Sequence, residues 1–222
     1  MDYSQILSQQ FNIKEEYAKN IITLLDDGNT IPFIARYRKE MHGSMDDQLI
    51  REFAEKLEYL RGLDKRRDEI RSLIDAQEKL TDEINLALDK AATLSELEDI
   101  YRPYRPKRKT RASIAKEKGL EPLANDILKQ EKGFDPSKSA VDYIDEEKGV
   151  TSVEDAIQGA MDIIAELVSD NAEIRKRIRN LTNANGVLVS VATDEEKDSV
   201  YKNYYDYKEP VKKIAGHRVL AV

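Results

Sequence analysis

The chain has no cysteine among its 222 residues. This absence excludes disulfide bonds, thiolate metal sites and cysteine nucleophiles, and it fits a reducing compartment. Glycine (9 residues) and proline (6 residues) are also sparse, while leucine, isoleucine, alanine, glutamate and lysine dominate. A composition of this kind is typical of a helical protein.

Long apolar runs are missing as well. No segment approaches the roughly 18 apolar residues that a membrane span requires, and residues 1–20 lack the basic start and apolar core of a signal peptide. We therefore expect a soluble, cytoplasmic chain with no membrane partner. Its length suffices for one large domain or two small ones.

The sequence offers little for catalysis. It has two histidines, His42 and His217, and neither has a carboxylate or a second histidine at metal-ligand spacing. No glycine-rich phosphate loop is present, and the carboxylates stand beside lysines and arginines as they do on solvated helix faces. We expect no catalytic residue, no metal and no cofactor, and hence no enzyme.

Apolar spacing predicts helices along the first half of the chain. Asn12 is expected to cap a helix that runs to about residue 26, and Ser44 with Asp47 is expected to begin a long helix to about residue 74. A short helix over 31–40 precedes the long one. We predict an all-α fold class: a multi-helical region with a helix-turn-helix-like element and at most one short strand.

The second half follows the same pattern. Thr81 is expected to cap a further helix, and Thr151 or Ser152 is expected to cap one continuous helix to about residue 185. Residues 186–192 alternate like a short strand without an obvious partner. We place the boundary between two helical lobes after residue 134, so the predicted lobes are 1–134, with a basic segment, and 135–222.

That basic segment, YRPYRPKRKTR at 101–111, differs from the rest of the chain. The window 101–118 holds eight basic residues and one acid, whereas the whole chain has a net charge of −7. Prolines at 103 and 106 favour extended backbone, so we expect a loop between helices. Arginine and lysine suit phosphate contacts, and Tyr101 and Tyr104 suit stacking on unpaired bases. The candidate nucleic-acid-binding residues are Arg102, Arg105, Lys107, Arg108, Lys109 and Arg111.

A second interpretation gives the same arginines a structural role. They would anchor the loop to nearby acidic helices, such as SELED at 95–99, and both interpretations stand. Two further basic clusters are weaker candidates for nucleic-acid contact. One is Arg36, Arg38 and Lys39; the other, expected to end a helix and balance its dipole, is Arg175, Lys176, Arg177 and Arg179.

Three stretches of the chain together resemble the N-terminal region of the Tex family of bacterial transcription accessory proteins. They are TIPFIARYRKEMHGSMDD (30–47), LEDIYRPYRPKRKTRASIAKEKGLEPLA (97–124) and NYYDYKEPVKKIAGHRVLA (203–221). The three lie in order over nearly the whole chain, and the middle one is long and compositionally unusual, so the resemblance is specific.

The resemblance implies a cytoplasmic protein whose all-helical N-terminal part, with its helix-turn-helix-like element, precedes an RNase H-like domain. Helix-hairpin-helix elements and a C-terminal OB-fold RNA-binding domain follow in the family. This sequence is expected to be a fragment that stops before the RNase H-like domain, so nucleic-acid binding is expected mainly through domains that lie outside it.

We therefore expect the helical N-terminal module of a Tex-like transcription accessory protein. It would make sequence-independent backbone contacts with RNA or DNA, and the transcription machinery is a further expected partner. The alternative is a non-binding scaffold, or protein-interaction module, that organises the downstream nucleic-acid-binding domains.

Overall fold

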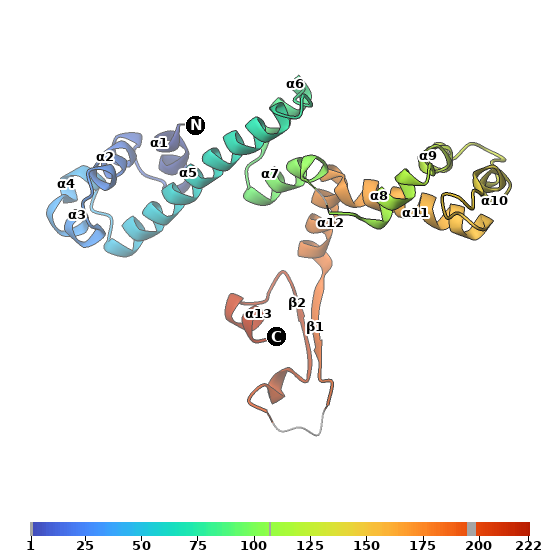
Figure 1. Cartoon of the computed structure of the whole chain (residues 1–222). Helices are drawn as coiled ribbons and strands as arrows, with labels where there is room; N and C mark the ends of the chain where they lie inside the picture. The colour runs from blue at the N-terminus through green and yellow to red at the C-terminus, as the bar shows by residue number, and fades with distance from the viewer. Residues whose placement is uncertain (1, 107, 195–198) are drawn as a thin grey trace. The chain divides into compact units, whose positions relative to one another are not determined.

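The computed structural model describes residues 2–106, 108–194 and 199–222. Within these ranges the chain forms thirteen α-helices, three short 3-10 helices and one two-stranded antiparallel sheet (Figure 1). The predicted predominantly helical class is confirmed. The chain divides into two compact units, Met1–Glu98 and Asp99–Val222, and the predicted lobe boundary after residue 134 lies inside the second unit.

The first unit begins with a helix that the apolar spacing had not predicted. Asp2 caps it, because its carboxylate accepts a hydrogen bond from Gln5 N at 3.2 Å. Asn12, predicted to start the next helix, instead ends this first one in the left-handed conformation, with φ +51°. The helices of this unit are α1 (Tyr3–Phe11), α2 (Glu15–Asp26), α3 (Ile31–Tyr37), α4 (Lys39–His42), α5 (Asp47–Asp75) and α6 (Asp82–Lys90).

The core of the first unit lies where α1, α2 and α3 pack against α5. Phe53 of α5 is fully buried, and its ring centroid lies 5.3 Å from that of Phe11 in α1. The predicted long helix is present, although Asp46 rather than Ser44 caps it by accepting from Leu49 N at 2.8 Å. The buried apolar members of this core are Leu7, Ala18, Ile21, Leu24, Ile34, Met45, Ile50, Phe53, Leu57 and Leu60.

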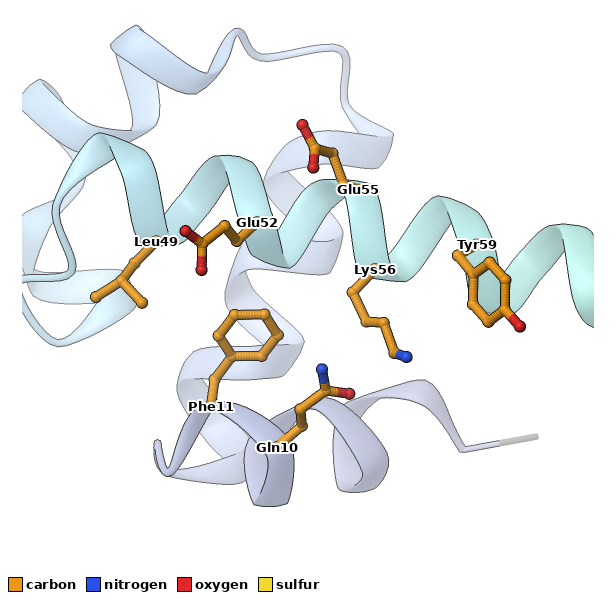
Figure 2. A pocket seen from close by; sticks show the side chains of 7 residues that line it. All are labelled: Gln10, Phe11, Leu49, Glu52, Glu55, Lys56 and Tyr59. Carbon is orange, nitrogen blue, oxygen red and sulfur yellow. The ribbon is translucent and has the colours of Figure 1, made fainter. Parts of the chain in front are cut away.

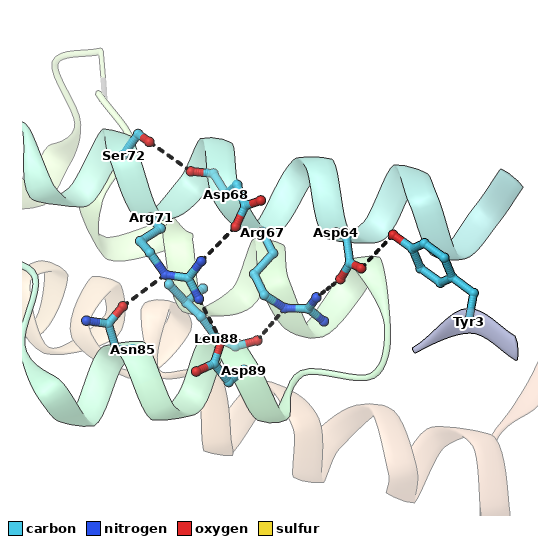
Figure 3. A network of polar contacts seen from close by, with 9 residues as sticks. All are labelled: Tyr3, Asp64, Arg67, Asp68, Arg71, Ser72, Asn85, Leu88 and Asp89. Carbon is cyan, nitrogen blue, oxygen red and sulfur yellow. Dashed lines mark hydrogen bonds and ion pairs between the residues drawn. The ribbon is translucent and has the colours of Figure 1, made fainter. Parts of the chain in front are cut away.

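Polar contacts tie the second half of α5 to the end of α6 (Figure 3). Arg67 is 5% exposed and donates to Leu88 O and Ala91 O, each at 2.9 Å. Those carbonyls belong to the end of α6, where Leu88 O also accepts a backbone hydrogen bond from Ala91 N at 3.3 Å. Asp64 pairs with Arg67 and accepts from the Tyr3 hydroxyl at 2.8 Å, so one buried arginine connects three helices.

The boundary between the two units falls within α7 (Leu94–Tyr101), whose last residues belong to the second unit. The single long helix predicted from Ser152 is wrong, because Asn171 breaks it. Asn171 leaves the helical conformation at ψ 115°, and its side chain then caps the next helix by accepting from Ile174 N at 3.0 Å. The elements are η1 (Arg102–Tyr104), α8 (Arg111–Glu117), α9 (Glu121–Lys129), α10 (Pro136–Ala140), η2 (Val141–Tyr143), α11 (Val153–Asp170), α12 (Ala172–Asn185), β1 (Val187–Val191), η3 (Lys202–Tyr204), β2 (Asp206–Pro210) and α13 (Gly216–Ala221).

Small side chains dominate the core of this unit, where α8, α9 and α10 pack on α11. Gly159 of α11 shows how closely α8 and α11 approach, since a Cβ there would lie 3.3 Å from Ala115 Cβ of α8 and 2.3 Å from Leu120 Cδ1. The ten buried core residues include six alanines: Ala112, Ala115, Ala124, Ala140, Ala156 and Ala160.

The strand predicted within 186–192 is present as β1, and its antiparallel partner β2 was not predicted. The register runs from Val187 opposite Pro210 to Val191 opposite Asp206. One face of this hairpin is partly covered by α13, whose Arg218 pairs with Glu209 at 2.7 Å. The other face carries exposed valines at 187, 189 and 191.

Candidate nucleic-acid interface

The basic segment 101–111 joins α7 to α8 in the second unit. It turns through η1, which contains Pro103, and then becomes extended at Arg105, with ψ 132° before Pro106. Thr110 ends the segment with a capping box, exchanging hydrogen bonds with Ser113 at 3.0 and 2.9 Å. Over the described residues 102–106 and 108–110, the predicted loop between helices is therefore confirmed, and both of its ends are fixed by local geometry.

The five described candidate residues of this segment are exposed, but they differ in what they contact. Arg102 Nε lies 3.0 Å from Asp170 Oδ1, and Lys109 Nζ lies 3.2 Å from Glu117 Oε2. The Arg105 guanidinium lies 5.9 Å from the centroid of the Tyr101 ring. The sixth candidate, Lys107, lies outside the described residues.

Arg108 and Arg111 form no ion pair with any described residue. Arg111 lines a depression between α8 and α11 together with Lys118, Asp155 and Asp162, so local charges there balance. Of the described candidates, Arg108 is thus the arginine most available to an external anion.

Tyr101 does not fit its predicted role in base stacking. Its side chain is 5% exposed, so the ring belongs to the interior and presents no face to a ligand. Tyr104 is half-buried. The reason is that Tyr101 still belongs to α7, and its helical position turns it inward. The sequence shows that an aromatic residue lies beside arginines, but it does not show in which direction the ring points.

The acidic stretch 95–99 contributes a buried contact that differs from the predicted anchoring of the basic segment. Asp99 is held by Arg175 Nε at 2.6 Å and by Arg179, both of which belong to α12. Arg102 does have an anchoring partner, but it is Asp170 at the end of α11.

Asp99 is a buried carboxylate, 5% exposed, with two arginines around it. Burial by itself raises its pKa, but the hydrogen bonds from Arg179 and Arg175 outweigh that effect, so the pKa of Asp99 lies below its ordinary value. The contact fixes the end of α7 against α12, only two residues before the basic segment begins. The contact of Asp99 with Arg175 and Arg179 therefore anchors the N-terminal end of the basic segment.

This contact also corrects the prediction for the cluster at 174–180. These residues lie in the first and middle turns of α12, and none of the basic ones is in its last turn. Arg175 and Arg179 act on Asp99, and Arg175 also donates to Ser169 O at 3.3 Å, near the end of α11. Nothing in the sequence near Arg175 points to Asp99, because the two are separated by 76 positions.

A groove in the first unit has the opposite electrostatic character (Figure 2). It lies between α1 and α5, where Phe11, Leu49 and Tyr59 supply apolar surface. Its lining also includes Glu52 and Glu55 and a single lysine, Lys56. Two carboxylates disfavour the approach of a phosphate backbone, so this groove is not part of the candidate interface.

Within the described ranges, no three or more histidine, aspartate or glutamate side chains are arranged to hold a metal ion. No helix in the described part of the chain has both the length and the apolar character needed to cross a membrane.

Comparison with known proteins matches both ends of the chain to models of one protein family. Residues 1–75 match the model of the Tex-like protein N-terminal domain, and residues 131–222 match that of the Tex central region. YdcI of Bacillus subtilis (strain 168) is 44% identical over 229 residues, covering all of this chain and 32% of the relative.

Two further relatives match the whole chain. The transcriptional accessory protein Tex of Neisseria gonorrhoeae is 39% identical over 224 residues, which are 29% of its length. The human S1 RNA-binding domain-containing protein 1 is 30% identical over 232 residues, which are 23% of its length. The chain thus spans a third or less of the curated relatives it matches. It is homologous to Tex proteins over its whole length and belongs to the N-terminal and central regions of the Tex family.

Proposed function

We propose that this region contacts the backbone of RNA or DNA through the basic segment, within a Tex-like transcription accessory protein. The carrying observation is that Arg108 and Arg111 are exposed and form no ion pair with any described residue, on a loop whose two ends are anchored. Arginines in this state bind phosphate oxygens without first breaking an internal contact.

The contacts would be independent of sequence, because the phosphate backbone is the same at every position. They would also be sensitive to salt, because each neutralised phosphate releases condensed counterions. Names of relatives support a nucleic-acid partner: one is a transcriptional accessory protein and another contains an S1 RNA-binding domain. We further propose that the complete protein works in the cytoplasm with the transcription machinery, is not an enzyme in this region, and binds nucleic acid mainly through other domains.

The test is a salt titration of the intact chain with fluorescent single- and double-stranded RNA and DNA. Replacing Arg108 and Arg111 together with glutamine should weaken binding to all four probes by a similar factor. The magnitude of the salt slope should fall by about one to two, since each arginine neutralises roughly one phosphate.

A matched control is available in the same unit. Lys132→Gln with Lys138→Gln makes the same change in net charge, and both lysines are exposed, one in α10 and the other shortly before it. The control pair should leave the affinity unchanged. If the control variant loses affinity equally, the effect of the arginine variant is explained by net charge alone. If the arginine variant binds with unchanged affinity, the basic segment does not contact nucleic acid.

One observation favours the second candidate function, a protein-interaction scaffold. In α11 no residue after Ile163 is buried, and α12 has no buried residue at all. Absence of nucleic-acid binding at low salt would favour this function over the first. The apolar side chains left exposed on these two helices are Met161, Leu167, Val168, Ile178 and Leu181.

A further inference from the structure

The short helices α3 and α4 carry a group of aromatic and basic side chains in the first unit. Phe33 and Tyr37 lie one turn apart on α3, and their ring centroids are 5.4 Å apart with an interplanar angle of 42°. The Arg38 guanidinium lies 5.1 Å from the Phe33 ring centroid. We call this group, with Arg36 and Lys39, the aromatic platform.

Tyr37 is the outermost member of the platform. Its side chain is 63% exposed, and no other large hydrophobic residue between 28 and 46 is as open to solvent. A protein partner usually needs a wider apolar patch around such a ring. A single open ring on a short segment that also carries Arg36, Arg38 and Lys39 instead matches the way in which proteins hold unpaired bases.

The cations of the platform are not engaged by carboxylates of the described residues. Arg36 and Lys39 are exposed and form no ion pair there, and Arg38 donates to the carbonyl of Tyr37 at 3.0 Å. Glu40 is the one acid within the stretch 30–43, which leaves a net positive charge beside the ring. This differs from the basic segment, where Arg102 and Lys109 are already paired.

Contacts with the core of the first unit hold the backbone of the platform in place. Ile34 is fully buried against the core, and the buried His42 donates from Nε2 to Ile34 O at 3.1 Å, fixing α4 to α3. Asn20 donates to Met41 O at 3.1 Å. Gly43 then ends α4 at φ +66°, where any Cβ would lie 2.6 Å from the Tyr17 ring. The backbone that carries the ring and the cations is therefore held in place by these contacts, which lowers the cost of ordering this segment on binding.

We propose that the aromatic platform is a second nucleic-acid contact, at which Tyr37 stacks on an unpaired base while Arg36 and Lys39 hold the adjoining phosphates. The ligand is single-stranded RNA or DNA, because a base within a duplex offers no free face to the ring. The platform belongs to a different unit from the basic segment. The inference thus does not rest on the function proposed for that segment.

The experiment measures fluorescence anisotropy of labelled 12-nucleotide oligo(U), oligo(dT) and a duplex of equal length with the intact chain at low salt. Tyr37→Ala should weaken binding to both single strands by about five- to a hundredfold, the range for removal of one stacked base, and should change duplex binding little. Tyr37→Phe keeps the ring and should retain the affinity.

Tyr59→Ala is the matched control. Tyr59 is 40% exposed in the same unit and has Lys56 Nζ 5.0 Å from its ring centroid, but it stands beside Glu52 and Glu55. This variant should bind all three probes like the unaltered chain. Tyr59 accepts a hydrogen bond from Leu94 N at 3.4 Å and Tyr37 packs on Phe33, so each variant should lower the thermal midpoint of unfolding slightly and both should remain folded.

Neutralising Arg36 and Lys39 with glutamine should lower the magnitude of the salt slope on single strands by about 0.7 for each phosphate that is no longer bound. The proposal is overturned if Tyr37→Ala binds single strands normally, if Tyr59→Ala is weakened as much, if the duplex is affected equally, or if the intact chain binds no single strand. A Tyr37 effect that persists when Arg108 and Arg111 are neutralised would support the platform even if the basic segment fails its own test.

Discussion

The core of the first unit is built from leucine, isoleucine and phenylalanine, whereas alanine supplies most of the buried positions in the second. Large side chains keep helix axes apart and concentrate stabilisation in a few residues, each of which removes much apolar surface from water. An alanine core brings helix backbones close together, and its stabilisation lies in many small contacts. The first unit should accordingly be sensitive to deletion of atoms and the second to their addition.

The largest expected effect is deletion at Phe53 in the first unit. Phe53→Ala should lower the free energy of unfolding by about 3–5 kcal/mol, because the ring is fully buried and its removal leaves a cavity beside Phe11. Chemical denaturation measures the change, and hydrogen exchange should show reduced protection in α1, α2 and α5. If the free energy of unfolding fell by less than about 1 kcal/mol, the core would have to collapse into the cavity. That result would contradict the expectation that the first unit is the one sensitive to deletion of atoms.

Next in size is removal of the charge on Asp99 in the second unit. Asp99→Asn should cost about 1.5–3 kcal/mol at pH 7, since the hydrogen bonds from Arg175 and Arg179 no longer reach a charged acceptor and both arginines remain. The matched variant Asp162→Asn, on α11 of the same unit, removes a carboxylate whose hydrogen-bond donor is the neutral amide of Gln158. It should change stability little.

The Asp99 contribution should also depend on pH in a defined direction. Its pKa in the folded chain lies below the ordinary 3.8. The stabilisation is therefore complete above about pH 5 and is lost as the pH falls from 3.8 through the lower folded value. The difference in stability between the unaltered chain and Asp99→Asn should shrink over that acidic window. A difference that stays constant to the lowest pH at which the chain is folded would contradict this.

Addition of one methyl group tests the alanine core directly. Gly159→Ala should destabilise the second unit by about 1–2 kcal/mol, because the new Cβ would meet Leu120 Cδ1 at 2.3 Å and the buried Leu120 side chain would have to move. Gly62→Ala in α5 is the control, since a Cβ there meets nothing within 4 Å and alanine favours a helix. Thermal unfolding of the two variants should move in opposite directions.

The smallest effect is expected from the exposed ion pair of the first unit. Arg61 contacts Asp26 through two hydrogen bonds, at 2.7 and 2.8 Å, with both side chains nearly half exposed. Arg61→Gln should cost about 0.2–1 kcal/mol, and less in high salt. Denaturation at two salt concentrations measures the loss of stability. A loss as large as that of Asp99→Asn would show that the difference in burial between the Arg61–Asp26 and Asp99–arginine contacts does not determine their contribution to stability.

The sequence predicted the features that depend on neighbouring residues. Thr81 caps α6 as expected by accepting from Ile84 N, and Ser152 caps α11 in the same way with Asp155 N. The helix α1 was missed although its signals are local, since Asp2 precedes apolar residues at helical spacing. The break at Asn171 was missed because the apolar pattern continues across it and outweighs a single capping residue.

The candidate site was predicted less completely. The basic segment and its loop conformation follow from prolines and charge, which are properties of the segment itself. Which arginines are already paired depends on partners such as Asp170, 68 positions from Arg102. The inward ring of Tyr101 and the open ring of Tyr37 likewise depend on burial, and no alternation or spacing near either residue distinguishes them.

The hairpin of the second unit has two unlike edges. Along β2 the residues Asp206, Lys208, Glu209 and Pro210 oppose pairing with another chain, whereas β1 reads Val-Leu-Val-Ser-Val without a charge or a proline. Within the described residues this sheet has no third strand. At high protein concentration, self-association should therefore begin along β1, and a lysine introduced at Val189 is the change that should suppress it.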